Sequence, residues 1–136
     1  MRPVFVDSGG FFAHLVSEDL LHNRAAALFA QADREHWRLF TTNAVVYETH
    51  ALLTNRAREG RDAGLQFLEQ IERGLCAVVR LTHEDEMKAT ALLHAHGDKN
   101  YSLCDALSFV ATERLGITDV IAFDRHFREY GTLTIL

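Results

Sequence analysis

Short apolar runs alternate with longer segments of helical period along this chain, and this alternation is the feature that most constrains its fold. Runs at 3–7, 37–41, 76–81, 119–123 and in the C-terminal TLTIL predict five strands. Apolar residues at helical spacing predict a short helical piece at FFAHLV and helices near 18–35, 43–58, 61–73, 82–97 and 102–115. The single proline, Pro3, leaves all the later helices uninterrupted.

Strands that alternate with helical crossovers favour one kind of architecture. The pattern predicts an α/β fold with a mostly parallel central sheet of about five strands and helices on both faces. At 136 residues the chain fits one domain, 1–136, which is long enough to bury a core without disulfides. Apolar residues at 48% and charged residues at 24% exclude a disordered chain.

Cysteine content and hydropathy indicate a compartment. Cys76 and Cys104 lack metal-ligand spacing, so both are expected to be reduced thiols of a cytosolic protein. The N-terminus has no basic and apolar leader, and no run approaches the roughly 18 apolar residues of a membrane span. We therefore expect a cytoplasmic protein with no membrane partner.

The formal net charge of −5 argues against binding nucleic acid through the overall field of the protein. A partner that contains phosphate would therefore need positive charge close to its binding site. Metal ions held by carboxylates could supply it, as could the small basic clusters around Arg56 and around Arg125.

Two aspartates end predicted strands. Asp7 follows VFV, and Asp124 follows DVIAF. Ligands of parallel α/β sheets bind at the carboxyl ends of the strands, so both acids are expected at one edge. Each could instead merely cap the helical turn that follows its strand.

Two further acids are predicted to lie on helices. Asp105 ends SLCD, which matches the S-x-x-D form of a capping box, although a cap leaves one carboxylate oxygen free. Glu48 shares an apolar stripe with Val45 and Leu52, so it is expected to point inward. An inward glutamate must be protonated, pair with a cation such as Arg, or bind a metal ion.

Together the four acids could converge on one crevice. Carboxylates packed together repel one another unless a hard divalent cation lies among them. Mg²⁺ or Mn²⁺ prefers such oxygen ligands. Asp7 is therefore interpreted as a metal ligand at the end of the first strand.

At these residues the chain resembles the PIN domain, the nuclease fold of the VapC-type toxins. The resemblance covers nearly the whole chain and is carried by VFVDSGGFFAHL, TTNAVVYETHALL, KNYSLCDALSFVATERLGI and DVIAFDRHF. It implies that the acidic, metal-binding positions of the family fall on Asp7, Glu48, Asp105 and Asp124.

The resemblance also implies roles for neighbouring residues. Ser8 and Asn43 could support the crevice, although both are equally good helix caps. Arg125 and Arg128 flank Asp124 closely enough to meet a phosphate backbone, although isolated arginines are more often simply solvated.

The implied activity is hydrolysis of RNA phosphodiester bonds by water, dependent on Mg²⁺ or Mn²⁺, by the toxin of a type II toxin–antitoxin pair. Asp7 and Asp105 would be the central ligands, with Glu48 and Asp124 completing the site. The implied partners are an RNA substrate, an antitoxin protein and a second copy in a homodimer.

Other classes of protein also place acids at strand ends. An aspartyl-phosphate enzyme would need a second Asp where Gly9 stands, and a receiver-like domain would need a strand-end Lys. The stronger alternative is a PIN-like module that binds RNA or protein without cutting, with its acids serving as caps.

Overall fold

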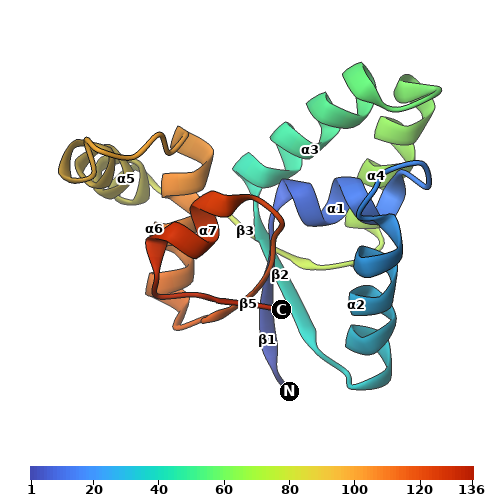
Figure 1. The fold of residues 1–136 in the computed structure, drawn as a ribbon, viewed down its shortest axis with the longest axis horizontal. Helices are drawn as coiled ribbons and strands as arrows, with labels where there is room; N and C mark the ends of the chain where they lie inside the picture. The colour runs from blue at the N-terminus through green and yellow to red at the C-terminus, as the bar shows by residue number, and fades with distance from the viewer.

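The computed structural model describes all residues, 1–136, and contains one five-stranded sheet in which every neighbouring pair is parallel (Figure 1). The spatial order is β3-β2-β1-β4-β5. The strands are β1 (Pro3–Val6), β2 (Arg38–Thr42), β3 (Ala77–Val79), β4 (Asp119–Ile121) and β5 (Thr134–Ile135). The predicted α/β class and parallel sheet are confirmed.

Strand β1 lies at the centre of this sheet. Phe5 is opposite Phe40 of β2 on one side and Val120 of β4 on the other. The chain first builds the sheet outward through β2 and β3, then returns to add β4 and β5 on the opposite side. The carboxyl end of β1 is therefore a topological switch point, where connections leave in opposite directions and open a crevice.

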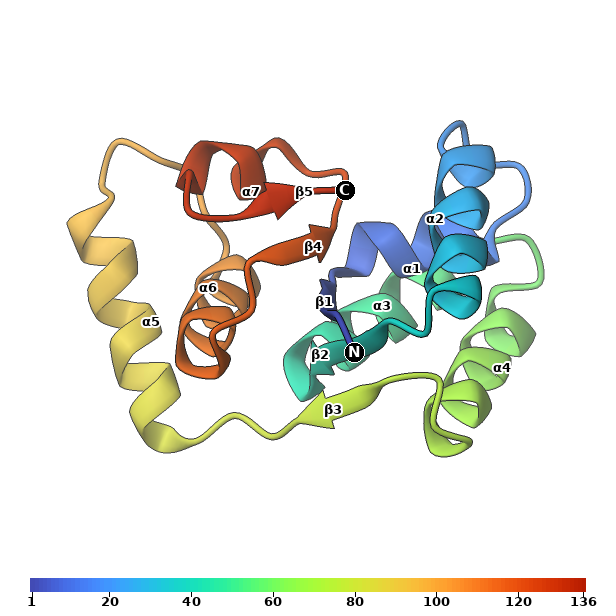
Figure 2. The same ribbon diagram turned by 90° about the horizontal axis from the view of Figure 1, so that it is seen from below.

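Helices cover both faces, as the alternation predicts. Figure 2 shows α1, α2 and α4 on one side of the sheet and α5 and α6 on the other. The bounds are α1 (Ser8–Leu15), α2 (His22–Arg34), α3 (Asn43–Arg56), α4 (Gly60–Glu72), α5 (His83–Ala95), α6 (Leu103–Leu115) and α7 (Arg125–Tyr130). Helix α3 packs against α1 and α4 and also reaches α6. None of the helices combines the length and the apolar character needed to cross a bilayer.

The core is built around β1 because both of its faces are covered. Val4, Phe5 and Val6 are fully buried, as the continuous apolar run of a central parallel strand requires. Phe11 of α1 packs on one side of the sheet, and Phe109 of α6 packs against other aromatic rings of the same cluster. This rigid centre holds the residue that follows β1 in place.

Several predicted boundaries shift. Helix α1 begins at Ser8, three residues before the predicted FFAHLV piece, because residues 8–10 already adopt helical geometry. Helix α2 begins at His22 rather than near 18, because the preceding segment forms a turn in which Asp19 accepts a hydrogen bond from the Leu21 N–H. The predicted strands 3–7 and 76–81 are shorter and end at Val6 and Val79.

Glycine is required at Gly60, where α4 begins against the end of α3. A Cβ at this position would lie 2.3 Å from the Thr54 carbonyl oxygen and 2.6 Å from that of Leu53. Both atoms belong to the backbone, so the helices would have to separate. Gly60→Ala is therefore expected to reduce the free energy of unfolding by about 2 kcal/mol, as measured by urea denaturation.

Gly97→Ala provides the control for this prediction. Its Cβ would have no heavy-atom neighbour closer than 3.9 Å, so the substitution changes the same residue type without a clash. An equal loss of stability in both variants would contradict the close-approach explanation.

Candidate active site

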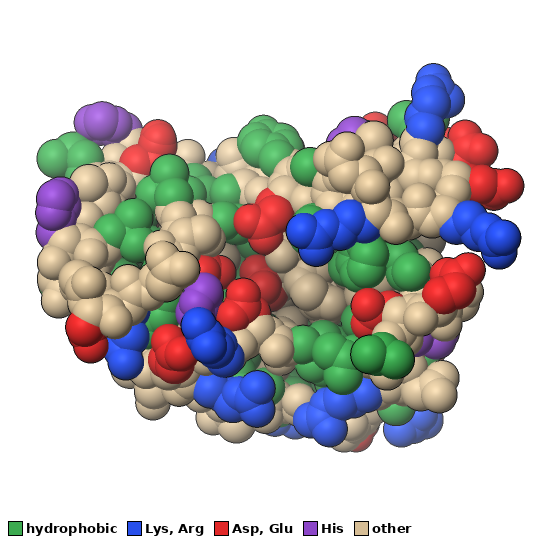
Figure 3. All heavy atoms as spheres, turned by 45° about the horizontal axis from the view of Figure 1, so that its top comes forward, with side chains coloured by type: hydrophobic (Ala, Val, Ile, Leu, Met, Phe, Trp, Pro, Cys, Tyr) green, Lys and Arg blue, Asp and Glu red, His purple; other side chains and the backbone are tan.

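A cleft of about 430 Å³ opens at the carboxyl end of β1. Figure 3 shows acidic side chains grouped in a hollow of this face, with Lys or Arg side chains around it. The cleft is lined by residues of α1 and α3 and of the loops that follow β1, α1 and β4, namely Asp7, Ser8, Gly9, Phe12, Asp19, Glu48, Leu52, Arg56 and Asp124. The acids predicted at the strand ends thus share one edge of the sheet.

Asp7 follows β1 directly and is only 4% exposed. It occupies the N-cap position of α1, but its side chain accepts no capping hydrogen bond, so capping does not account for it. The pKa of Asp7 is raised to about 7, mainly by burial and then by the charges of Glu48, Asp105 and Asp124, which together outweigh the lowering effect of the Ser8 backbone N–H. The carboxyl group of Asp7 therefore lies within the field of the other three acids.

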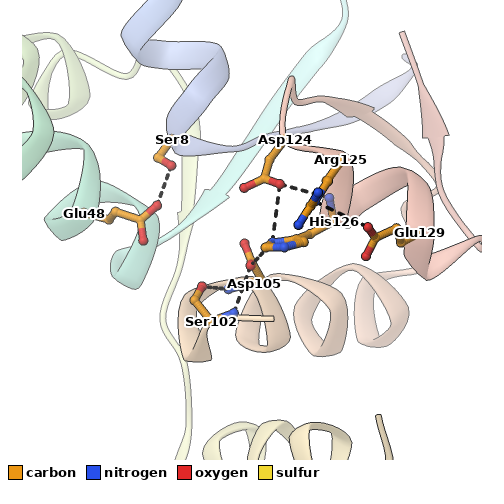
Figure 4. A network of polar contacts seen from close by, with 8 residues as sticks. All are labelled: Ser8, Glu48, Ser102, Asp105, Asp124, Arg125, His126 and Glu129. Atoms are coloured by element: carbon orange, nitrogen blue, oxygen red, sulfur yellow. Dashed lines mark hydrogen bonds and ion pairs between the residues drawn. The ribbon is translucent and has the colours of Figure 1, made fainter. Parts of the chain in front are cut away.

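Glu48 points into the cleft from α3. Its Oε1 accepts a hydrogen bond from Ser8 Oγ at 2.5 Å (Figure 4). No Arg or Lys forms an ion pair with it, so the Arg-paired alternative considered for this residue is wrong. Ser8 is itself buried, and its hydroxyl group holds the Glu48 carboxylate in this position.

Asp105 and Asp124 both cap helices, as their sequence contexts predict. Asp105 Oδ2 accepts a hydrogen bond from the Ser102 N–H in a capping box, and Asp124 Oδ1 accepts one from the His126 N–H. These bonds leave the second oxygen of each carboxylate free. Figure 4 shows both carboxylates turned toward the same space.

His126 joins these two acids and was not among the predicted site residues. Its Nδ1 lies 2.9 Å from Asp105 Oδ2 and 3.4 Å from Asp124 Oδ1 (Figure 4). Potential ligand atoms of Asp105, Asp124 and His126 lie within 4.8 Å of one another, close enough to share one metal ion. The sequence signal for this contact is the D-x-H spacing at the start of α7. The side chain of His126, two residues after the N-cap Asp124, lies beside the capping carboxylate.

Asn43, by contrast, is not brought to the cleft. Its Oδ1 accepts a hydrogen bond from the Leu81 N–H, which ties the start of α3 to the segment after β3. The cap of α3 is Thr42, whose side chain accepts from the Val45 N–H. The expectation that Asn43 supports the site therefore finds no contact in the structure.

The two basic residues after Asp124 lie on α7 and are exposed. Arg125 pairs with Glu129 at 3.6 Å. Arg128 has no acidic partner within ion-pair distance, and neither arginine is among the residues that line the cleft.

Cys104 precedes Asp105 and lies beside the acids. Burial, together with the charges of Glu48 and Asp7, raises the pKa of its thiol far above the usual range. The thiol therefore stays protonated at neutral pH and is a poor metal ligand. The donor set remains one of carboxylate oxygens with a single imidazole.

The arrangement fits a hard divalent cation. Four carboxylates face a common space, and neither Arg nor Lys forms an ion pair with any of them; His126 alone contacts two of them, Asp105 and Asp124. Such a set is electrostatically unfavourable alone, and carboxylate oxygens are the donors that Mg²⁺ and Mn²⁺ prefer. The residues present can therefore hold a divalent metal ion.

Comparison with known protein families shows to which family the chain belongs. The family model described as PIN domain matches residues 4–133. This chain belongs to the PIN domain family. The match confirms the resemblance that the four motifs indicate, and it assigns the fold of nearly the whole chain to the PIN domain.

This PIN domain is similar to a curated protein of Mycobacterium tuberculosis, the 23S rRNA-specific endonuclease VapC20. The identity is 29% over 135 residues, which cover 97% of both chains, in strain CDC 1551 / Oshkosh and in strain ATCC 25618 / H37Rv.

Solved structures show the same fold. The crystal structure of M. tuberculosis VapC20, described as a Sarcin-Ricin loop cleaving toxin, superposes on this PIN domain with a TM-score of 0.86 at 29% identity, covering 94% of this chain and 95% of that one. VapBC2 from Rickettsia felis, solved bound to a DNA fragment from its promoter, gives a TM-score of 0.68 at 9% identity and covers 99% and 98% of the two chains. The second likeness concerns the fold alone.

Proposed function

We propose that this PIN domain is an endoribonuclease that depends on Mg²⁺ or Mn²⁺ and is the toxin of a type II toxin–antitoxin pair. The observation that carries the proposal is the convergence of Asp7, Glu48, Asp105 and Asp124 on one crevice, where burial and then the charges of the other three acids raise the pKa of Asp7 to about 7. The similarity to an rRNA-specific endonuclease over 97% of both chains supports it.

In this proposal Asp7 and Asp105 hold the metal centrally, and Glu48 and Asp124 complete the site. When bound, the metal supplies a Lewis acid that offsets phosphate charge and lowers the pKa of a water ligand. The protein contributes positioning. Ser8 fixes the orientation of Glu48, and His126 keeps Asp105 and Asp124 close together.

Arg125 and Arg128 are proposed to contact the RNA backbone at the rim. Their exposed charges lie beside an acidic cleft in a protein of net charge −5, where a phosphate needs local attraction. An antitoxin that covers the cleft, a homodimeric state and a cytoplasmic location belong to the same proposal, which follows the toxin resemblance.

The proposal is tested by RNA cleavage with purified protein. We expect cleavage of an RNA hairpin with the sarcin-ricin loop sequence, or of total RNA, in Mg²⁺ or Mn²⁺, and none in EDTA. Asp105→Asn is expected to lower the rate to background, because the neutral amide binds metal weakly while it can still accept the capping hydrogen bond from the Ser102 N–H.

Two controls accompany this experiment. Ser102→Ala removes the cap but keeps the carboxylate of Asp105, and it is expected to retain most activity with reduced stability. Asp33→Asn removes an exposed acid of α2 and is expected to behave as wild type. Wild-type, metal-dependent rates in Asp105→Asn would refute the proposed site.

A second candidate function is a PIN-like module that binds without cutting. It is favoured by the capping bonds that Asp105 and Asp124 make. Titration with Mn²⁺ discriminates, because acids that serve only as caps would bind the ion weakly and at no defined site.

A further inference from the structure

One cation in the acidic cleft has no partner in the protein. Arg56, in the last turn of α3, lines the cleft together with Asp7, Glu48 and Asp124. It is exposed and forms no ion pair with any acid within 4.0 Å, although acids line the same hollow. A guanidinium held at the edge of a carboxylate cluster without neutralising it is free to bind an anion from solution.

The spacing along α3 places this cation away from the reacting bond. Glu48, Leu52 and Arg56 are separated by four residues each and therefore share one face of the helix. Eight residues of α-helix span about 12 Å, so the start of the Arg56 side chain is farther from Glu48 than the width of one phosphate group. On this spacing, an anion bound to Arg56 would be a second phosphate of the same strand, distinct from a phosphate at the four acids.

An apolar surface lies between the acids and Arg56. It is formed by Leu52 and by Phe12 of α1, both partly buried and both lining the cleft. An aromatic ring and an aliphatic side chain offer a flat surface on which a nucleotide base can stack regardless of its identity. The order of groups along the cleft is therefore acids, apolar surface and cation, which matches the order phosphate, base and phosphate in a single strand.

Charge limits the extent of this subsite. Beyond Arg56 a neighbouring hollow contains Arg58 but also Glu18, Glu59 and Asp62. The excess of acids there disfavours contacts with further phosphates of the RNA backbone. The surface beyond the apolar residues therefore accommodates one extra phosphate, at Arg56.

We propose that Arg56 binds the phosphate adjacent to the cleaved phosphodiester of a single-stranded RNA, and that the Phe12–Leu52 surface supports the base between them. The inference rests on the proposed nuclease function and adds a specific substrate subsite to it. Arg56 is a substrate-positioning residue in this proposal, since it does not reach the reacting atoms.

The test uses kinetics on an RNA oligonucleotide that carries the mapped cleavage site. Arg56→Gln is expected to raise KM about tenfold with little change in kcat, the factor expected when one hydrogen bond to a charged group is lost. Arg34→Gln is the matched control, because Arg34 is also an exposed arginine in the last turn of a helix and lies outside the cleft. It is expected to give wild-type values.

Neutral methylphosphonate linkages identify the phosphate concerned. For the wild-type protein and for Arg34→Gln, one methylphosphonate next to the cleavage site is expected to raise KM about tenfold, again the value of one charge-assisted contact. For Arg56→Gln the same linkage is expected to cause no further loss, because its partner is already absent. An abasic residue between the two phosphates is expected to raise KM, whereas exchanging one base for another is not.

The outcomes separate the two proposals. An equal methylphosphonate penalty in wild type and Arg56→Gln would overturn the subsite and leave the nuclease function intact. Unchanged RNA kinetics with weakened binding of a partner protein would also overturn it, since Arg56 would then serve protein recognition. A wild-type protein that cleaves no RNA would overturn both.

Discussion

Metal-free Asp7→Asn is expected to be more stable than the wild-type protein by about 4 kcal/mol at pH 8, while its RNA cleavage falls to background. The carboxyl group of Asp7 has a pKa raised to about 7 from an ordinary value of 3.8, mainly by burial and then by the neighbouring acids. A rise of about three pKa units corresponds to about 4 kcal/mol against the charged form. Asparagine has the same shape and avoids this cost, but it loses the charge that binds metal.

The sign of the pH dependence follows from proton binding. Between pH 4 and 7 the folded protein keeps the Asp7 proton that the unfolded chain has already lost, so the contribution of this group to stability falls as pH rises. Above pH 7 both states are ionised and the contribution is constant. The stability difference between Asp7→Asn and wild type should therefore be absent below pH 4, grow up to pH 7 and then level off.

Urea denaturation in EDTA across this pH range measures the difference. Asp33→Asn, which changes an exposed aspartate, is the control and should match wild type at every pH. Saturating Mg²⁺ should reduce or reverse the advantage of Asp7→Asn, because an ion that binds only the folded wild-type protein stabilises it. Equal stabilities of wild type and Asp7→Asn at pH 8 without metal would show that burial and the neighbouring acids do not disfavour the charged form of Asp7 in the folded protein.

The second large effect is expected at an ion pair between α5 and α6, away from the cleft. Asp85 is 2% exposed and accepts hydrogen bonds from Arg114 at 3.0 Å and 2.8 Å. Arg114→Met leaves this buried carboxylate without its counter-charge. The Arg114 side chain itself is 40% exposed, so water partly screens the pair. We expect the free energy of unfolding to fall by about 2 kcal/mol at pH 7, because the buried carboxylate loses two charge-assisted hydrogen bonds.

The pH dependence of this pair has the opposite sign. Burial raises the pKa of Asp85, but the hydrogen bond from the Thr82 N–H and the Arg114 guanidinium outweigh burial and lower it overall. The pair therefore contributes stability above the ordinary pKa of an aspartate and loses it as pH falls through the lowered value. Arg114→Met should cost less stability in acid than at pH 7.

A double variant isolates the buried charge as the cause. Asp85→Asn combined with Arg114→Met removes both charges but keeps an acceptor for the Thr82 N–H in the capping box. It should recover much of the stability lost in Arg114→Met, as measured by urea denaturation at pH 7. No recovery would mean that the packing of the Arg114 stem, and not its charge, carries the effect.

The order of strands and helices could be predicted because its signals are local. The apolar run of β1 and the glycines and caps that end or begin helices, such as Gly116 and Thr82, act within a few residues. The four acids could be selected for the same reason. Asp7 and Asp124 follow apolar runs, Asp105 completes a capping box, and Glu48 lies on an apolar stripe of its helix.

What the sequence by itself determined is therefore the alternation of elements and the acids that they present at one edge. Only the tertiary structure decided which side chains meet there: His126 lies between Asp105 and Asp124, Asn43 turns away to Leu81, and Arg56 stays unpaired. These outcomes depend on the strand order β3-β2-β1-β4-β5, which brings together segments a hundred residues apart. Periodicity and capping are set by neighbours in the chain, whereas the meeting of distant side chains is set by how the finished elements pack.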